Sequence, residues 1–502
     1  MSEAADAVCG IDVGSQGACL SVFTADGERL ATTHQSYDVE YPRPGWAEQD
    51  PGSWTTAVAD GLQALGESVD LDRIAAISFA SQLDGLVCAD EDGKPLGNAI
   101  IWLDRRADPI CREVAERFAP EDWYARSGCN LDGSHVAAKI AWVTRNRPEE
   151  NGQAARYLLP GAFLLRHVCG ADAIDPTNAS STMALDPDTS SWDEELLAAF
   201  GIDPERLPPV VPSESVVGEI GTAFAAETGL RSGTAVVCGC GDEMGATLGA
   251  GLCEPGAVCD VLGTAEPVCA VADSPLREPT RVAECHPHAA PGRWLLENPG
   301  WASGASYRWF RDELGGPDGY EELNELAASA PAGSDGLVFL PWMGGAMAPV
   351  WDADARGAWY GLTPAHGRAH LCRALLEGSA YAFRDVVEAV EAAGLGCERI
   401  VCVAGGARAA LVRQLRADVT GIPVAWSEDV ETTARGAAML AAVGAGLHES
   451  VPAAAAAMSR LASEWHEPDS SQAELYHAGY ARYRKLFELL SPGFADLAAS
   501  QS

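Results

Sequence analysis

A chain of 502 residues is too long for one compact core and long enough for two, and its 47 % apolar fraction supports ordinary globular packing. The formal net charge of −38 argues against nucleic acid or an anionic membrane as a partner, because binding to such surfaces depends on Lys and Arg. Any phosphate must therefore be held locally, by backbone amides and a metal ion.

The cysteines and the N-terminal residues indicate the compartment. Fifteen cysteines are spread along the chain, several inside apolar runs, which is typical of reduced, buried thiols. Cys238 and Cys240 are the only close pair, and the two-residue gap and partner cluster of a zinc site are missing there. Acids stand where a secretory signal would carry positive charge, and no apolar run reaches the roughly 18 residues of a membrane span. We expect a soluble, cytoplasmic protein.

The N-terminal segment is predicted to form an antiparallel meander of three strands, over residues 8–11, 18–24 and 29–33. A glycine-containing turn at 14–17 and the hairpin signal Asp26-Gly27 separate these strands. Pro51 suits the first position of a helix that continues to about residue 65. Strands follow at 74–80 and 86–89.

The second half repeats this plan. Strands at 258–262 and 267–271 flank another glycine turn, and an amphipathic helix is expected over 370–393. A strand at 400–404 leads into a further glycine turn. We therefore expect an α/β protein made by internal duplication, with domains at 1–248 and 249–502 and a cleft between them. A peripheral helix at 451–462 and a frayed terminus after Pro492 complete the prediction.

Two turns about 250 residues apart each combine a carboxylate, a glycine and a hydroxyl: Asp12-Val13-Gly14-Ser15-Gln16-Gly17 and Asp260-Val261-Leu262-Gly263-Thr264-Ala265. Glycines let backbone N–H groups approach phosphate oxygens, and an acid can hold a phosphate-bound magnesium through water. One turn on each half would hold a triphosphate from both sides. There is no Walker loop, and the glycines before Met244 do not match the dinucleotide fingerprint.

Asp242 follows an apolar strand that ends in alternating glycines and precedes a run of small residues typical of a helix. A helix N-terminus favours negative charge by roughly 0.3 to 1 kcal/mol, and the glycines would let a substrate hydroxyl reach the carboxylate. These features predict a catalytic base. A plain N-cap role explains this feature equally well.

Polar residues and an indole follow two other apolar strands, in Ser81-Gln82-Leu83-Asp84-Gly85 and Trp102-Leu103-Asp104-Arg105-Arg106. They suit a sugar, whose hydroxyls need hydrogen-bond partners and whose C–H face stacks on an aromatic ring. The alternative is a surface loop with an Asp–Arg ion pair and a tryptophan that fills the core.

Together these motifs resemble the FGGY family of carbohydrate kinases, in the superfamily of actin, hexokinase and the heat-shock ATPases. The resemblance covers nearly the whole chain and includes residues 44–51, 207–220, 355–357, 361–362, 370–378 and 404–408. It implies two ribonuclease H-like domains and transfer of the γ-phosphate of MgATP to a sugar hydroxyl across the cleft.

The resemblance also implies roles for individual residues. Asp242 corresponds to the general base and Asp12 to the acid near magnesium. The phosphate turns would use Gly14, Ser15, Gln16, Gly263 and Thr264, and adenine and ribose would lie on Gly405, Gly406 and Ala407. The sugar would contact Gln82, Leu83, Asp84, Trp102, Asp104, Arg106, Asp242 and Glu243.

Within the family the layout most resembles xylulokinases, with departures at the sugar. Asp84 stands where those enzymes usually carry His, Leu83 replaces Met, and Glu243 replaces Asn. The added carboxylates predict a neutral ketose or polyol and not an aldonate: a ketopentose such as D-xylulose first, then ribulose, erythrulose or glycerol. Glu266 beside ATP would be unfavourable unless it faces away or helps to hold the metal.

Other classes remain open. A non-catalytic ATP-binding regulator would keep the two turns without acceptor chemistry, and an ATPase of the same superfamily would have no use for the sugar-facing residues. A homodimer is compatible with the sequence, but no feature establishes one.

Overall fold

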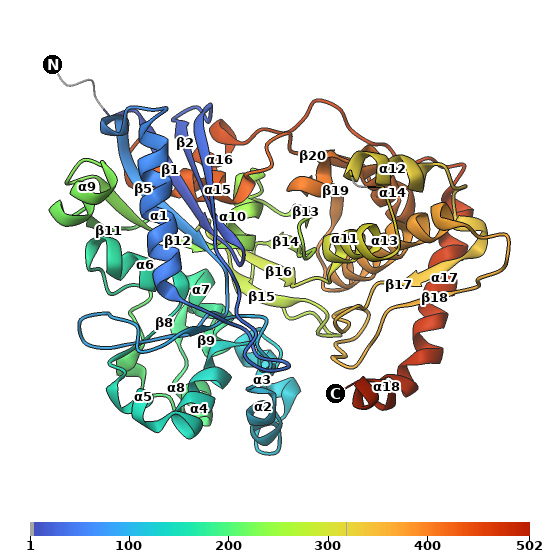
Figure 1. The fold of residues 1–502 in the computed structure, drawn as a ribbon, viewed down its shortest axis with the longest axis horizontal. Helices are drawn as coiled ribbons and strands as arrows, with labels where there is room; N and C mark the ends of the chain where they lie inside the picture. The colour runs from blue at the N-terminus through green and yellow to red at the C-terminus, as the bar shows by residue number, and fades with distance from the viewer. Residues whose placement is uncertain (1–4, 318, 502) are drawn as a thin grey trace.

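Each half of the chain is built around one six-stranded mixed sheet (Figure 1). The computed structural model describes residues 5–317 and 319–501; the first four residues, part of the acidic N-terminus, lie outside this description. The first sheet has the order β11-β12-β5-β1-β2-β3. Its strands are β1 (Ala7–Val13), β2 (Gly17–Thr24), β3 (Arg29–Ser36), β5 (Ile74–Ser81), β11 (Val216–Glu219) and β12 (Ala235–Gly241).

The second sheet has the order β15-β16-β14-β13-β19-β20. Its strands are β13 (Gly256–Val261), β14 (Val268–Ala272), β15 (Glu284–Pro287), β16 (Trp294–Asn298), β19 (Cys397–Val403) and β20 (Val424–Trp426). In both sheets three antiparallel strands, β3-β2-β1 and β16-β14-β13, continue into two parallel strands, β5-β12 and β19-β20. The shared order confirms the predicted meander and supports the duplicated plan.

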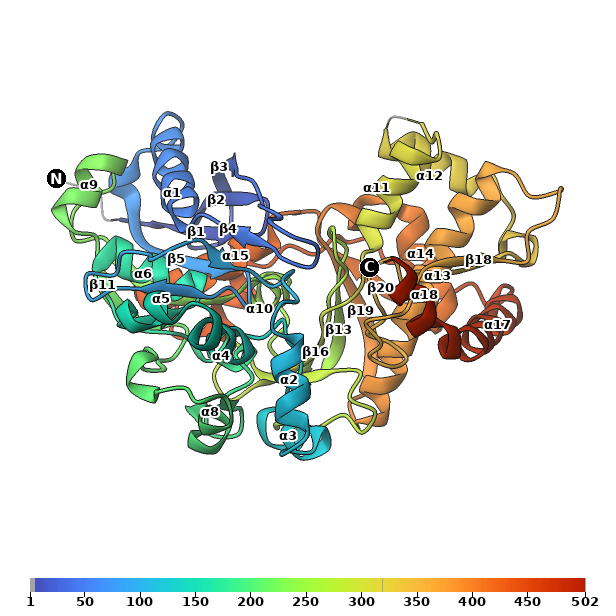
Figure 2. The ribbon, with the colours of Figure 1, turned by 60° about the horizontal axis from the view of Figure 1, so that its bottom comes forward.

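Four two-stranded sheets and the helices complete the fold (Figures 1 and 2). The small sheets pair β4 (Glu48–Gln49) with β7 (Ala99–Ile100), β6 (Val87–Ala89) with β8 (Arg156–Leu158), β9 (Leu185–Asp186) with β10 (Ser191–Trp192), and β17 (Val338–Leu340) with β18 (Ala358–Tyr360). The helices of the first half are α1 (Pro51–Gly66), α2 (Asp108–Ala115), α3 (Pro120–Ser127), α4 (Val136–Asn146), α5 (Pro148–Gln153), α6 (Pro160–Cys169), α7 (Pro176–Ser181), α8 (Glu194–Phe200), α9 (Thr222–Thr228) and α10 (Asp242–Gly249). Those of the second half are α11 (Ser303–Glu313), α12 (Tyr320–Ala328), α13 (Arg368–Ala392), α14 (Ala410–Thr420), α15 (Thr432–Gly444), α16 (Val451–Met458), α17 (Ala473–Leu490) and α18 (Phe494–Gln501).

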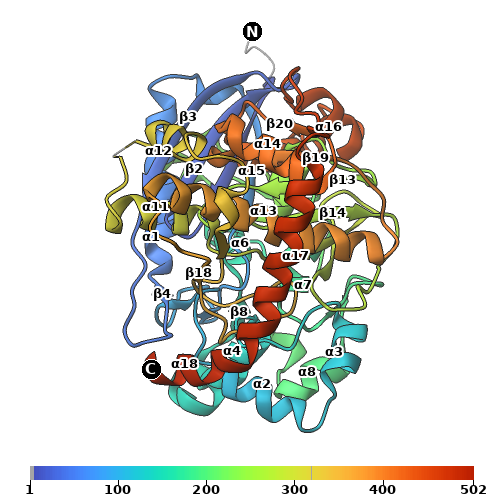
Figure 3. The ribbon, with the colours of Figure 1, turned by 90° about the vertical axis from the view of Figure 1, so that its right-hand side faces the viewer.

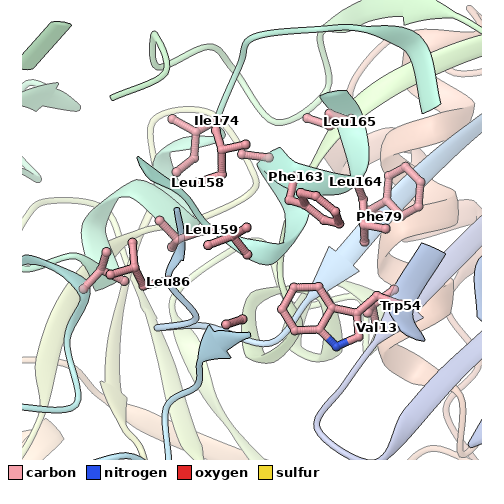
Figure 4. Close-up of a cluster of buried hydrophobic side chains, with 14 of the residues drawn as sticks. Val13, Trp54, Phe79, Leu86, Leu158, Leu159, Phe163, Leu164, Leu165 and Ile174 are labelled. Atoms are coloured by element: carbon pink, nitrogen blue, oxygen red, sulfur yellow. The ribbon is translucent and has the colours of Figure 1, made fainter. Parts of the chain in front are cut away.

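The core of the first half forms where α1 and α6 cover the sheet. Asp50 caps α1 by accepting a hydrogen bond from the Gly52 amide, and Pro51 occupies the first turn as predicted. Trp54 on α1 is fully buried and meets Phe163 of α6 edge-on, with ring centroids 6.2 Å apart (Figure 4). This packing fixes the helices against the strands whose ends carry the candidate site.

Helix α15 comes from the C-terminal part of the chain but packs against the first sheet and α10 (Figure 1). Close approach requires small residues: a Cβ on Gly10 would lie 1.8 Å from the Ala434 carbonyl oxygen, and one on Gly436 would lie 2.0 Å from that of Gly245. Because residues 432–444 pack on the first half, the boundary at 248/249 does not separate all of the packing, and it stays a prediction.

Two of the remaining predictions are confirmed and one is wrong. The long helix expected at 370–393 is α13, and the peripheral helix at 451–462 is the shorter α16. The terminus after Pro492 is not frayed, because it forms α18, which follows the long α17 (Figure 3). Phe494 anchors α18, being buried with its ring centroid 5.9 Å from that of Phe487.

The state of the cysteines and the character of the helices can be compared with what the composition predicts. All fifteen cysteines are free thiols, and all but Cys169 and Cys397 are buried. Among the described residues, none of the helices combines the length and apolar character needed to cross a bilayer.

Candidate active site

Asp12 and Asp242 lie at the same end of the first sheet, where the parallel strands β1, β5 and β12 have their carboxyl ends. Asp12 on β1 and Cys240 on β12 are both in register with Ala80 of β5, which runs parallel to each of them. Asp242 follows two residues after Cys240 as the first residue of α10. The N-cap residue is Gly241, and no side chain in the described part of the protein caps this helix, so the N-cap reading of Asp242 is wrong.

The environment of Asp242 suits a base at neutral pH. Burial raises the pKa of this carboxyl to about 7, the backbone amides of Asp242 and Glu243 oppose that change, and the negative charges of Glu297 and Asp84 add to it. A general base works best when its pKa lies near the operating pH, because it is then both deprotonated and basic enough to accept a proton.

Asp12 fits a magnesium-binding role. Its Oδ1 atom is buried without a hydrogen-bond partner in the described part of the chain. Burial, with the charges of Asp242 and Glu431, holds its pKa well above the usual range. A carboxylate left unpaired among other carboxylates is a place where a hard divalent cation would relieve the repulsion.

The first phosphate turn is tied to the loop that carries Trp102. The turn closes through a 3.0 Å hydrogen bond from the Gly14 amide to the Gly17 carbonyl, and Tyr37 Oη donates to the Gly14 carbonyl over 2.6 Å. Trp102 Nε1 donates to Ser15 Oγ over 2.7 Å. Since an indole can only donate, Ser15 accepts here and keeps its own proton for another acceptor. Trp102 is 36 % exposed, so the prediction that it fills the core is wrong.

Gln82 and Leu83 lie between this turn and Asp242. Gln82 is buried and donates to Gln49 Oε1 over 2.8 Å, while its own Oε1 has no partner among the described residues. Leu83 packs against Gly241, where a Cβ would come within 2.4 Å of Leu83 Cδ2. Gln16, by contrast, has an exposed side chain.

A series of side chains with alternating charges starts at Asp84 in the first half of the protein and continues into the second half. His135 Nδ1 lies 3.2 Å from Asp84 Oδ1 and its Nε2 lies 3.6 Å from Glu284 Oε1. His286 Nε2 lies 3.6 Å from Glu284 Oε2 and 3.5 Å from Glu297 Oε2. Both imidazoles and both glutamates are buried. The order is therefore Asp84, His135, Glu284, His286, Glu297.

The pKa shifts of the groups in this series follow from its geometry. Burial by itself lowers the pKa of His135, but the charges of Asp84 and Glu284 overcome it and hold that pKa well above its usual range. His286 behaves alike, with a net pKa of about 9 between Glu284 and Glu297. Burial raises the pKa of Glu284, yet the two imidazoles lower it to about 2. Both histidines are therefore imidazolium ions at neutral pH.

Glu243 joins this group from α10. Burial raises its pKa well above the usual range, and the charges of Glu297, Asp242 and Asp84 act in the same direction. The structure thus brings the carboxyl groups of Asp84, Asp242 and Glu243 into one neighbourhood, which we call the acceptor site.

Asp104 and Arg106 are paired with each other in the interior of the first half. Arg106 Nη2 donates to Asp104 Oδ2 over 2.7 Å and Arg106 Nη1 lies 2.7 Å from Glu48, and both partners of the first pair are buried. The Arg106 guanidinium lies 3.7 Å from the ring centroid of Trp46. This is the predicted alternative of an Asp–Arg ion pair, placed inside the protein and not on a surface loop. It orders the segment that follows Trp102.

The second phosphate turn lies beside the adenine loop. The Gly263 amide donates to the Ala265 carbonyl over 3.1 Å, and the Gly406 amide donates to Leu262 over 2.9 Å. Gly405 and Thr264 are exposed, whereas Ala407 is buried. Arg308 of α11 donates to Thr264 Oγ1 over 3.3 Å. Sequence reasoning missed this cation, which only helix packing brings to the turn.

The two acids of the second turn face away from it. Asp260 Oδ2 accepts from Arg416 Nε over 2.8 Å, and Glu266 accepts from Arg416 and, over 2.8 Å, from Ser379. All four residues are buried. Burial raises the pKa of Glu266 to about 8 against the opposing charge of Arg416. The prediction that each turn offers a carboxylate to magnesium is therefore wrong for the second turn. There Asp260 and Glu266 bind Arg416 in the interior of the domain.

Comparison with known proteins agrees with this geometry. Residues 7–249 match the N-terminal domain and residues 259–445 the C-terminal domain of the FGGY family of carbohydrate kinases. The chain is 30 % identical over 495 residues to a xylulose kinase of Staphylococcus epidermidis, covering 98 % of both chains. It is 34 % identical over 457 residues to a glycerol kinase of Gloeobacter violaceus, covering 88 % of both.

The solved structures support the same fold. A ligand-bound xylulose kinase of Lactobacillus acidophilus superposes with a TM-score of 0.91 at 26 % identity, covering 98 % of this chain and 99 % of that one. The expected two-domain architecture of the actin and hexokinase type is thereby confirmed. The chain belongs to the FGGY family of carbohydrate kinases and is a sugar kinase that uses ATP with Mg²⁺.

Proposed function

We propose that this kinase phosphorylates a neutral ketose, and a ketopentose such as D-xylulose in the first place. The observation that carries the proposal is the acceptor site, where Asp242, with a pKa of about 7, shares a neighbourhood with Asp84 and Glu243. Carboxylates accept hydrogen bonds from sugar hydroxyls and repel an anionic acceptor. Xylulose kinases match the chain along nearly its whole length, as does a gluconokinase of Bacillus subtilis, so the choice between a neutral and an anionic acceptor rests on these carboxylates.

In this proposal Asp242 accepts the proton of the attacking hydroxyl. Asp84, held by imidazolium His135, accepts a hydrogen bond from a second hydroxyl and orients the sugar. Leu83, packed on Gly241, gives the apolar contact beside the base. The amide oxygen of Gln82, which has no hydrogen-bond partner within residues 5–317 and 319–501, can accept from the sugar or from water. Asp104 and Arg106 act by supporting Trp102, because their polar groups are already paired.

At the nucleotide, the turns that contain Gly14 and Gly263 would let phosphate oxygens approach closely, and the hydroxyls of Ser15 and Thr264 would donate to them, with Gln16 nearby and Arg308 supplying positive charge. Gly405, Gly406 and Ala407 would form the adenine and ribose surface. Asp12 would hold Mg²⁺, through water. Bound there, Mg²⁺ neutralises charge on the phosphates during transfer.

A screen of acceptors by coupled ADP release tests the proposal. The panel contains D-xylulose, D-ribulose, L-ribulose, L-xylulose, erythrulose, glycerol and gluconate, with Asp242→Ala as the blank. A neutral ketopentose should give the highest kcat/KM. A preference for gluconate would overturn the neutral-acceptor proposal, and ATP binding without acceptor-stimulated ADP release would indicate a regulator.

Glycerol is the second candidate, because the glycerol kinase of Gloeobacter violaceus is 34 % identical to this chain. The same screen separates the two by their relative kcat/KM. The cytoplasmic location, a homodimer and the domain limits 1–248 and 249–502 stay predictions.

A further inference from the structure

A group of metal-binding side chains lies one strand away from Asp12. Asp12 on β1 is the cross-strand partner of Cys19 on β2, and Cys19 is in turn the partner of His34 on β3. Cross-strand partners point to the same face of a sheet, with neighbouring strands about 4.8 Å apart. The three side chains therefore form a row on the face that α15 covers.

Glu431, immediately before α15, lies over this row. Its Oε2 accepts from Cys19 Sγ over 3.1 Å, and its Oε1 lies 3.0 Å from His34 Nε2. The ligand atoms of Cys19, His34 and Glu431 all lie within 4.8 Å of one another. Three potential ligands of different chemical type thus converge from two strands and from a segment about 400 residues away.

The spacing agrees with a tetrahedral ion. Zinc bonds of about 2.0 to 2.3 Å place neighbouring ligand atoms about 3.4 to 3.6 Å apart, so shifts of about half an ångström would convert the hydrogen-bonded cluster into a coordination shell. Thr32 Oγ1, 3.7 Å from Cys19 Sγ, stands behind the thiol.

We propose that Cys19, His34 and Glu431 bind one zinc-class divalent cation, with water as the fourth ligand. A thiolate and an imidazole select Zn²⁺ or Co²⁺ over Mg²⁺, which prefers oxygen ligands. The Cys19 thiol proton leaves to solvent as the metal–sulfur bond forms. The His34 side chain is 59 % exposed at the sheet edge, which gives the ion a path to the buried thiol.

Such an ion would join β2 and β3 to the C-terminal part of the chain. Arg29 on β3 already pairs with Asp429 over 2.6 Å, and Arg435 of α15 donates to the Gly27 carbonyl over 2.7 Å. A ligand that binds only the folded state stabilises it, so Zn²⁺ should raise the thermal midpoint. This site is distinct from the magnesium-binding role of Asp12, because two of its ligands, Cys19 and His34, are softer than a carboxylate and none of the three is Asp12.

Cobalt titration of the reduced, full-length protein tests the proposal. Chelator-treated protein is titrated with Co²⁺ in excess Mg²⁺, while thiolate-to-cobalt absorption in the near ultraviolet is recorded. We expect one Co²⁺ per chain, a thiolate band, and displacement of the band by Zn²⁺. Cys19→Ser should abolish the band, and His34→Gln should weaken binding about tenfold or more with the band retained.

Cys129→Ser is the matched control, because Cys129, Glu284 and His286 form a second Cys–Glu–His group among the described residues, one in which all three residues are buried. It should leave the band and the affinity unchanged. A missing band, a band that survives Cys19→Ser, or a band lost in Cys129→Ser would overturn the assignment. If Cys19→Ser does not fold, unchanged affinity in the exposed-site variant His34→Gln would overturn it as well.

Discussion

His135 and Glu284 face each other between the two halves of the molecule, with Nε2 and Oε1 3.6 Å apart. The other ring nitrogen of His135, Nδ1, lies 3.2 Å from Asp84 Oδ1. Because Glu284 belongs to β15, His135 connects an acceptor-site carboxylate to the second sheet. A cation between two carboxylates attracts both of them and so fixes their orientation. The acceptor site is thus completed by residues from both sheets.

Replacing His135 should therefore impair sugar binding more than the chemical step. In His135→Gln, Asp84 loses its imidazolium partner and the acceptor KM should rise about tenfold or more, with a smaller change in kcat. Steady-state kinetics with saturating ATP measures both parameters.

His288→Asn serves as the matched control for that experiment. His288 is also buried, but burial lowers its pKa to about 4, and as a neutral ring it accepts from the Ala290 amide over 2.7 Å. An equal rise in KM in both variants would show that buried imidazoles act only through stability.

Asp242→Asn should abolish turnover and spare nucleotide binding. The amide has the shape of the carboxylate but cannot accept the hydroxyl proton, so kcat should fall by about 10²-fold or more. Calorimetric titration with ATP should give an affinity close to that of the unchanged protein. Retained kcat would remove Asp242 from the role of base.

Activity should rise with pH through about 7. Asp242 accepts a proton only when ionised, and its pKa is raised to about 7, so kcat/KM should fall as the pH drops below that value. The profile should show an acid limb with an apparent pKa near neutrality, owed to the group of interacting carboxylates. Asp84→Asn removes one of the negative charges that raise the pKa of Asp242 and should move that limb to lower pH.

Trp102→Phe should weaken nucleotide binding modestly. The change keeps an aromatic ring but removes the donor that holds Ser15 Oγ at 2.7 Å. One net hydrogen bond corresponds to about 0.5 to 1.5 kcal/mol, so the ATP dissociation constant should rise roughly two- to tenfold. Tyr41→Phe, at a side chain that is 66 % exposed, is the control for an aromatic substitution. No change in ATP affinity would indicate that Ser15 needs no partner.

Arg416→Met should destabilise the second domain. It leaves Asp260 and Glu266 buried without their cation, and breaking such a buried pair costs about 3 to 5 kcal/mol of unfolding free energy. Denaturant unfolding measures this loss. Glu266→Gln should cost less and should leave ATP affinity unchanged, because that side chain points away from the phosphate turn. Altered ATP affinity would place Glu266 at the nucleotide.

Much of the fold was predictable, because it depends on local patterns. Alternating apolar residues and glycine turns identified the meanders of both sheets, and Pro51 marked the start of α1. The glycines before Asp242 placed that acid at the start of a helix. Family motifs then identified the chemistry, because they are themselves short and contiguous.

The sequence by itself determined the strands that flank the two glycine turns, the turns themselves and the identity of the candidate base, since each depends on residues that are neighbours in the chain. Only the tertiary structure decided that Glu266 and Asp260 turn inward to Arg416, that Arg308 reaches Thr264, and that His135 meets Glu284. The physical reason is that the direction and charge of a polar side chain depend on partners that are often more than a hundred residues away in the sequence. The local spacing of residues does not identify those partners.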